Sequence, residues 1–382
     1  MGISKLYAVC VCVCVNIFTR FIWQTLFICI HMENSKIFEK AEEMGSLDKV
    51  ARFDYSNLIS IESLFQAWNG FKVGKRRRKD VQIFEKNLED NLFNLFENLK
   101  TKTYMHAYYM AFNIYDPKFR NIHKATVEDR IVHHAIVSAI EPLFDKSFIY
   151  DSYSCRVNKG THRAVKRLNV FIRKVSNNYK GECYCLKLDI RKFFASVDHN
   201  ILLSLIRKKI YDKDLIWLLE NILKSFSEEK SIPIGNLTSQ IFANIYMNEL
   251  DQFMKHKLRV KYYVRYADDF VVLSRDKDYL ENLIPRIEEF LKNGLELSLH
   301  PNKIKIRKYT QGIDFLGYVI LPHYILPRTR TRKRMFKKLQ TKINSDTFNQ
   351  SLQSYLGFLG HANSFKLTQQ LKNQVWLWKD GS

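Results

Sequence analysis

Two short runs rich in β-branched and aromatic residues lie close together in the second half of the chain. The first spans residues 260–265, the second spans residues 270–274, and the four residues Tyr-Ala-Asp-Asp at 266–269 separate them. Two such runs around a short acidic link predict a β-hairpin. The adjacent carboxylates of Asp268 and Asp269 then lie at the tip of this hairpin.

A third run, which ends at Asp189, alternates with the two-residue period of a β-strand. Tyr184, Leu186 and Leu188 fall on one face of this strand. Lys187 and Asp189 fall on the other face. A carboxylate at the end of a buried strand is costly unless it is paired, because burial removes its hydration. We therefore expect Asp189 to share a partner with the hairpin aspartates.

Elsewhere, apolar residues recur at intervals of three and four, which is the period of an α-helix. This spacing predicts helical structure over residues 46–112, where the apolar stripe is interpreted as core, and a further helix around residues 335–343. Another helix is expected to begin after Asp198, which we interpret as its capping residue and not as a metal ligand.

The composition favours a polyanionic partner. The chain has 61 Lys and Arg residues against 39 Asp and Glu, a net charge of +22. This balance suits a nucleic-acid-binding protein, although a basic ribosome-associated or merely soluble protein has it too. With 382 residues, 46% of them hydrophobic, the chain is expected to hold two or three subdomains. Its seven cysteines form no disulfide framework, so we expect free thiols and a reducing, cytoplasmic location.

The amino terminus is predicted to be an apolar, low-complexity leader of residues 1–31. Residues 6–30 are long and apolar enough to span a bilayer, but residues 9–15 strictly alternate Val and Cys. No small-residue signal-peptide cleavage site follows them. We expect a mis-assigned start with Met32 as the real initiator, and a membrane anchor is the alternative. A membrane partner is expected only if residues 6–30 are translated.

The carboxylates of Asp189, Asp268 and Asp269 together suit a divalent cation. Hard cations such as Mg²⁺ take oxygen ligands, and two of them about 4 Å apart can activate a 3′-hydroxyl and stabilise a leaving pyrophosphate. Two adjacent aspartates alone more often form a polar turn, and the third carboxylate is what favours nucleotidyl transfer. The sequence offers no Ser-His-Asp order, no zinc-type spacing and no Walker-type glycine loop as an alternative.

These motifs carry a family resemblance. The segments at 189–194, 266–269 and 315–317 resemble the palm motifs of reverse transcriptases. More narrowly, the chain resembles the reverse transcriptases of diversity-generating retroelements. The segments with this narrower similarity are Ile-Gly-Asn-Leu-Thr-Ser-Gln at 234–240, the segment 151–162, and the motifs at 354–357 and 361–364. The resemblance covers roughly residues 55 to 375.

The resemblance implies an α+β, right-hand polymerase fold with fingers, palm and thumb. We expect N-terminal helices and fingers in residues 32–180 and a palm of antiparallel sheet plus helices, with the catalytic centre, in residues 181–320. A small basic helical thumb is expected in residues 321–382.

The resemblance also implies roles for individual residues. The catalytic residues and ligands of two Mg²⁺ ions would be Asp189, Asp268 and Asp269. The nucleotide-binding residues would be Arg156, Lys159, Phe194, Ile234, Gly235, Gln240 and Lys303. The primer grip would be Phe315, Leu316 and Gly317. Phe194 is expected to exclude a ribose 2′-hydroxyl, with ordinary core packing as the alternative. Lys303 is expected to assist protonation of the leaving group, with an exposed surface lysine as the alternative.

Ile234 departs from many reverse transcriptases, which carry glutamine before this glycine. Isoleucine donates no hydrogen bond, so a contact worth about 1 kcal/mol to discrimination against mispairs is absent. This agrees with the function that the resemblance implies, namely error-prone copying of a template-repeat RNA into cDNA, with errors at adenines that diversify a target gene. Better packing of isoleucine in this palm is the alternative.

The implied partners are an RNA template, a DNA or RNA primer, dNTPs and a small basic accessory protein. One alternative is a group II intron or retron reverse transcriptase, which the missing maturase length and the Ile-Gly…Ser-Gln motif disfavour. Another is a non-catalytic RNA-binding relic, which the three intact carboxylates disfavour.

Overall fold

The computed structural model of the protein describes residues 54–115 and 119–380. The predicted leader, residues 1–31, and the expected initiator Met32 lie outside these described residues. Within the described part, no helix is both long enough and apolar enough to cross a bilayer.

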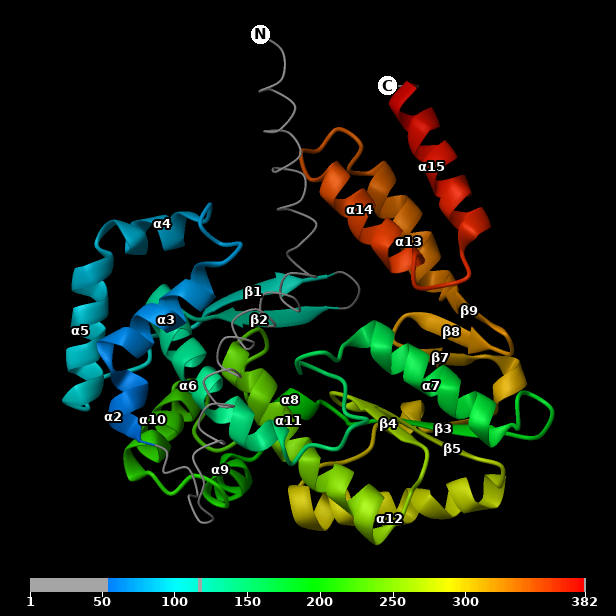
Figure 1. Ribbon diagram of the computed structural model, residues 1–382, viewed down its shortest axis with the longest axis horizontal. Helices are drawn as coiled ribbons and strands as arrows, with labels where there is room; N and C mark the ends of the chain where they lie inside the picture. The colour runs from blue at the N-terminus through cyan, green and yellow to red at the C-terminus, as the bar shows by residue number, and fades with distance from the viewer. Residues whose placement is uncertain (1–53, 116–118, 381–382) are drawn as a thin grey trace, which may run out of the picture.

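The N-terminal part of the described chain is a layer of helices, with α2 to α5 at the left of Figure 1. The helices are α2 (Tyr55–Ile59), α3 (Ile61–Lys72), α4 (Lys79–Lys86), α5 (Leu88–Lys100) and α6 (Val127–Asp145). α3 packs along α6. Val81, Leu92 and Leu95 are fully buried, so the predicted apolar stripe is part of the core.

The helical prediction over residues 46–112 is wrong at its C-terminal end. After α5 the backbone of Lys102 takes a left-handed φ of 58°, and the chain then extends. Strand β1 (Met110–Ile114) pairs with β2 (Arg120–Lys124) in an antiparallel hairpin. Apolar residues are almost continuous from Tyr104 into β1, so this segment lacks the three-to-four spacing that a helix needs.

A four-stranded antiparallel sheet forms the centre of the molecule, with the strand order β4-β5-β3-β6. Its strands are β3 (Tyr184–Asp189), β4 (Tyr263–Tyr266), β5 (Asp269–Ser274) and β6 (Lys305–Lys308). The predicted hairpin is confirmed, since β4 and β5 pair from Tyr266 and Asp269 outward. β3 pairs with the other side of β5. The run that ends at Asp189 therefore lies beside the hairpin that carries the other two aspartates.

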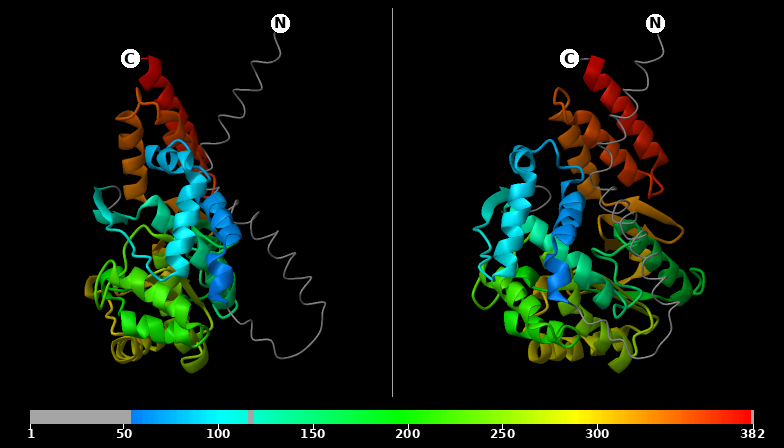
Figure 2. Two further views of the ribbon diagram at one scale, coloured as in Figure 1. Left: turned by 90° about the vertical axis from the view of Figure 1, so that its left-hand side faces the viewer. Right: turned by 60° about the vertical axis from the view of Figure 1, so that its left-hand side comes forward.

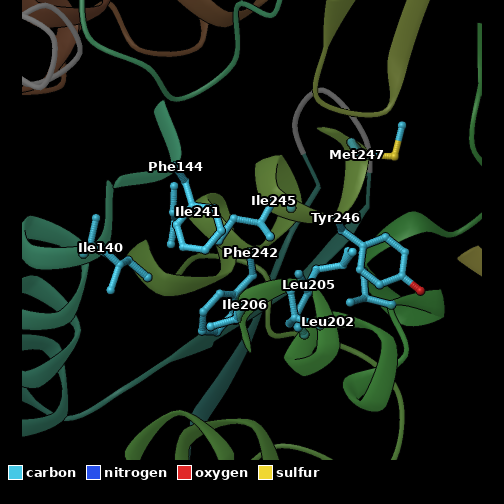
Figure 3. Close-up of a cluster of buried hydrophobic side chains, with 14 of the residues drawn as sticks. Ile140, Phe144, Leu202, Leu205, Ile206, Ile241, Phe242, Ile245, Tyr246 and Met247 are labelled. Atoms are coloured by element: carbon cyan, nitrogen blue, oxygen red, sulfur yellow. The ribbon is translucent and has the colours of Figure 1, made fainter. Parts of the chain in front are cut away.

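The alternation of β3 separates two hydrophobic cores, one on each face of the sheet. Leu186 and Leu188 belong to the larger core, and Cys185 belongs to the smaller one. The larger core is closed by helices α8 (Phe193–Ser196), α9 (His199–Arg207), α10 (Lys213–Lys224), α11 (Leu237–Gln252) and α12 (Lys277–Leu295). Figure 3 shows side chains of α6, α9 and α11 that meet in this core. Asp198 caps α9 as predicted, because its carboxylate accepts hydrogen bonds from the backbone N–H groups of Asn200 and Ile201.

The smaller core lies under α7 (Thr161–Val175) and a second, three-stranded antiparallel sheet. The strands of this sheet are β7 (Ile313–Phe315), β8 (Tyr318–Leu321) and β9 (Tyr324–Pro327). The chain ends in helices α13 (Thr329–Gln340), α14 (Phe348–Leu359) and α15 (Phe365–Asp380), which share a core of their own. In Figure 1 the N-terminal helices lie at the left and the C-terminal helices stand at the upper right, above the β7–β9 sheet, and Figure 2 shows both groups from two further sides. The structure therefore has the α+β, right-hand arrangement that the resemblance implies.

A cluster of rings ties the C-terminal helices to the rest of the molecule. The ring of His162, at the start of α7, stacks on His361 with their centroids 3.6 Å apart. The hydroxyl of Tyr318 donates to the carbonyl oxygen of Phe358 over 2.9 Å, so it accepts from Nδ1 of His162, which lies 3.1 Å away. Asn363 adds a reciprocal pair of hydrogen bonds with the backbone of β9. Two of the motifs that carry the narrower resemblance, far apart in sequence, thus meet at this point.

Candidate active site

The structure brings the three predicted carboxylates together at one end of the central sheet. Asp189 is the last residue of β3 and pairs in register with Asp269, the first residue of β5. Asp268 stands in the two-residue turn between β4 and β5, and its carbonyl oxygen accepts from the backbone N–H of Ile190 over 3.3 Å. The three acidic residues therefore lie next to one another on two paired strands and the turn that joins β4 to β5.

The turn that carries Asp268 is held in an unusual backbone conformation. Ala267 has a φ of 53°, a left-handed value that residues other than glycine seldom adopt. Its carbonyl oxygen accepts a hydrogen bond of 3.1 Å from Nη1 of Arg265. A fully buried guanidinium thus fixes the position of the turn.

Arg265 is itself held by a buried polar network. Its guanidinium forms an ion pair of 2.6 Å with Asp251, and it donates to the hydroxyl of Ser152 over 3.0 Å. The hydroxyl of Tyr263 donates to the same Asp251 carboxylate over 2.8 Å. The sequence interpretation missed both Arg265 and Asp251. The signal for Arg265 was a cation directly after the apolar Tyr-Tyr-Val at 262–264, next to the acidic turn.

The electrostatics of the three carboxylates favour cations. Burial, followed by the negative charge of Asp189, raises the pKa of Asp268 to about 6. Nζ of Lys303 lies 2.5 Å from Asp189, and Nζ of Lys187 lies 3.3 Å from Asp269. Two lysines therefore balance part of the charge of the cluster.

Oxygen donors on adjoining strands fit a divalent metal chemically. In the described part of the chain, however, no three His, Cys, Asp or Glu side chains converge closely enough to hold an ion. Lys303 and Lys187 instead form ion pairs with two of the three carboxylates.

The segment that contains Ile234 and Gly235 is attached to the β1–β2 hairpin. The carbonyl oxygen of Ile234 accepts from the backbone N–H of His123, and the side-chain amide of Asn236 donates to the carbonyl of the same His123. Gly235 has a φ of 112°, and a Cβ there would lie 2.8 Å from the side chain of Ile122. Only glycine fits this contact, which the sequence interpretation did not foresee.

Two other predicted nucleotide-binding residues flank this region. Phe194 is half-buried, and its ring meets the edge of the buried Phe193 ring at a centroid distance of 5.5 Å. Gln240 lies in the first turn of α11 and is also half-buried.

Arg156 and Lys159 make contacts with residues 145–152. The guanidinium of Arg156 is nearly buried, forms an ion pair of 2.5 Å with Asp145, and donates to the carbonyl oxygens of Ile149 and Ser152. Nζ of Lys159 donates to the carbonyl oxygen of Tyr150 over 2.7 Å. These contacts favour a structural role for Arg156 and Lys159. The lysines that contact the predicted catalytic aspartates are Lys187, at Asp269, and Lys303, at Asp189.

The predicted primer-grip residues form the turn between β7 and β8. Leu316 and Gly317 are its two central residues, with φ values of 50° and 91°, as the favoured two-residue hairpin turn requires. Phe315, before the turn, is fully buried. Nζ of Lys187 donates to the carbonyl oxygen of Asp314 over 3.2 Å. Lys187 thus links this hairpin to the aspartate cluster, beside a basic cavity of about 170 Å³.

Comparison with known proteins matches residues 115–320 to the family described as "Reverse transcriptase (RNA-dependent DNA polymerase)", more than half of the chain. Protein YkfC of Escherichia coli is 24% identical over 244 residues, covering 53% of this chain and 64% of the relative. The group II intron-encoded protein LtrA of Lactococcus lactis subsp. cremoris is 22% identical over 366 residues, covering 75% of this chain and 58% of the relative. The retron Ec73 reverse transcriptase of Escherichia coli is 27% identical over 194 residues, covering 46% of this chain and 61% of the relative.

The chain spans less than two thirds of the length of each of these relatives. Among solved structures, a telomerase from Candida albicans in complex with a fragment of telomeric RNA is similar, with a TM-score of 0.46 and 11% identity. The alignment covers 78% of this chain and 59% of the telomerase.

Proposed function

Because the chain belongs to the reverse transcriptase (RNA-dependent DNA polymerase) family, we propose that it is an RNA-directed DNA polymerase with its catalytic centre at Asp189, Asp268 and Asp269. The observation that carries this proposal is the register pairing of Asp189 with Asp269, next to the turn that holds Asp268. The direct test is primer extension on an RNA template with dNTPs and Mg²⁺. A folded protein that binds the primer–template but forms no cDNA would contradict the proposal.

The proposed mechanism assigns separate tasks to the residues of the site. Asp189, Asp268 and Asp269 would hold two Mg²⁺ ions, which would supply activation of the primer 3′-hydroxyl and charge stabilisation at the leaving pyrophosphate. Lys303 leaves Asp189 and donates a proton to the pyrophosphate oxygen. Arg265 keeps the Asp268 turn in position through the Ala267 carbonyl.

The half-buried ring of Phe194 is proposed to lie beneath the sugar of the incoming nucleotide. Phe194→Ala is expected to raise ribonucleotide incorporation relative to deoxynucleotides on the order of tenfold, because the space for a 2′-hydroxyl is then open. Primer extension with rNTPs and dNTPs in separate reactions measures the change. Phe193→Leu is the control, since it alters the adjoining buried ring. If Phe194→Ala keeps the preference for deoxynucleotides over ribonucleotides, the Phe194 ring serves only in packing.

For the subgroup, we propose error-prone copying of a template-repeat RNA, assisted by a small basic accessory protein. The apolar Ile234 side chain and the motifs around 151–162 and 361–364 support this assignment. A group II intron-like or retron polymerase is the second candidate, because LtrA and the retron Ec73 enzyme are among the relatives.

Ile234→Gln is expected to raise fidelity roughly fivefold to tenfold, most strongly at template adenines. The introduced amide stabilises the transition state of the correct pair more than that of a mispair, by about 1 kcal/mol. Sequencing of cDNA made from a defined RNA, with the accessory protein present, measures the error rate at each base. Ile234→Val is the control, because it keeps the position apolar. An unchanged adenine error rate in a variant that extends normally would place the cause of infidelity elsewhere.

A further inference from the structure

A further cavity lies at the end of the central sheet that is opposite to the aspartates. It encloses about 400 Å³ and is lined by the end of α7, the segment that leads into β4, the end of β5 and the first turn of α12. β5 runs from Asp269, in the predicted catalytic centre, to Ser274, at this cavity. The two ends of this strand are about 17 Å apart, because a strand rises about 3.4 Å per residue. The cavity is therefore outside the proposed polymerase centre.

The described residues that line this cavity include four cations and no acid. The cations are Lys174, Arg259, Lys261 and Arg275. All four side chains are exposed, and they come from three separate stretches of the chain. Like charges that gather at one place raise the local positive potential, which attracts anions. The cavity therefore favours an anionic ligand.

Acidic residues at the start of α12 have other partners. Asp276 caps this helix, since its carboxylate accepts hydrogen bonds from the backbone N–H groups of Asp278 and Tyr279. Glu281 forms an ion pair of 2.8 Å with Lys277. None of the four lining cations takes part in these contacts.

The backbone on both sides of the cavity is fixed by side-chain donors. Nζ of Lys255 donates to the carbonyl oxygens of Val260 and Lys261 over 3.2 and 3.0 Å. On the other side, Nε of Arg275 donates over 2.5 Å to the carbonyl oxygen of Val175, the last residue of α7. A fixed backbone lowers the entropy cost of binding, because less of the site must be ordered by the ligand.

Two tyrosines complete the lining. The half-buried ring of Tyr262 meets the edge of Phe171 at a centroid distance of 5.3 Å, and Nζ of Lys261 lies 5.5 Å from the Tyr262 centroid. The side chain of Tyr279 is 37% exposed, so part of its ring is available for contact. Cations beside aromatic rings suit a nucleotide, since its phosphate meets the charge and its base stacks on a ring. The volume is also in the range of small-ligand sites.

We propose that this cavity binds a nucleotide, with its phosphate at the lining cations and its base against Tyr279. Two sources supply this chemistry, a free nucleoside triphosphate and a nucleotide of an RNA segment that is not being copied. The proposal goes beyond the polymerase function, because no residue of the aspartate cluster takes part in it.

The basic run at residues 255–261 contains a matched control. Lys257 and Lys261 lie four positions apart, and both are exposed. Lys261 lines the cavity, whereas Lys257 does not. Replacement of either residue by alanine removes the same charge, but only Lys261→Ala removes it from the cavity.

The test measures the affinity of the full chain for two probes by fluorescence anisotropy, without Mg²⁺. The probes are the fluorescent ATP analogue mant-ATP and a fluorescein-labelled RNA hairpin without a primer. Lys261→Ala and Lys174→Ala, which alter different walls, are each expected to weaken binding of at least one probe about tenfold, because each removes a charge-assisted contact with phosphate. Lys257→Ala is expected to leave both affinities nearly unchanged.

The two probes distinguish the sources of the nucleotide. A selective loss of mant-ATP binding in Lys261→Ala assigns the cavity to a free nucleotide, and adenosine, which lacks phosphate, is then expected not to displace mant-ATP. A selective loss of hairpin binding assigns the cavity to RNA that is not being copied. Equal affinities of Lys261→Ala and Lys257→Ala for both probes, with both variants folded in urea unfolding, would overturn the proposal. Displacement of mant-ATP by adenosine as effectively as by ATP would overturn it too.

Discussion

Asp189→Asn or Asp268→Asn is expected to reduce nucleotide addition on the order of a thousandfold or more, with RNA affinity nearly unchanged. Each change removes a negative charge that would hold metal, and stabilisation of transition-state charge depends directly on that metal. RNA affinity depends instead on the basic surface of the protein, which the substitution leaves intact. Single-turnover primer extension and RNA binding, measured on the same preparation, give the two quantities.

Asp198→Asn provides the matched control for these variants. It makes the same acid-to-amide change in the same part of the molecule, and asparagine caps a helix about as well as aspartate does. Its polymerase activity is therefore expected to stay close to that of the unmodified protein. Near-normal rates in Asp189→Asn or Asp268→Asn would show that the metal assignment is wrong.

Arg265→Met is expected to lower the free energy of unfolding by about 3–5 kcal/mol. Both partners of the Arg265–Asp251 ion pair are fully buried, so removal of the guanidinium leaves an uncompensated carboxylate in the core. Urea unfolding followed by circular dichroism measures the loss. Lys277→Met breaks the exposed pair with Glu281, and it is expected to leave stability nearly unchanged.

A double variant separates stability from positioning of the active site. Arg265→Met combined with Asp251→Leu removes both buried charges and is expected to recover much of the lost stability. It does not restore the hydrogen bond to the Ala267 carbonyl, so polymerase activity is expected to stay low. Full activity in a stable double variant would show that Arg265 has no role beyond packing.

Features encoded by neighbouring residues could be predicted from the sequence. The hairpin at 266–269, the alternation of the strand that ends at Asp189, and the Asp198 cap each depend on a few consecutive positions. The β1 strand was mistaken for helix because a nearly continuous apolar run has no distinguishing period.

Partners that are distant in sequence could not be predicted in this way. Lys303 meets Asp189 across 114 positions, and Asn236 meets His123 across 113. Only the fold brings such pairs together. The predicted role of Arg156 depended on a nearby turn, and its ion pair with Asp145 is invisible without the path of α6.

The stack of His162 on His361 makes the C-terminal helices and the β7–β8 turn a single mechanical unit. Tyr318 is the first residue after the Leu316–Gly317 turn, and its hydroxyl links both the Phe358 carbonyl and His162. A tilt of α14 therefore pulls on that turn and on the start of α7 together. A change in the angle of the C-terminal helices is therefore expected to reach the predicted primer-grip turn directly, through the Tyr318 hydroxyl and the two stacked imidazole rings.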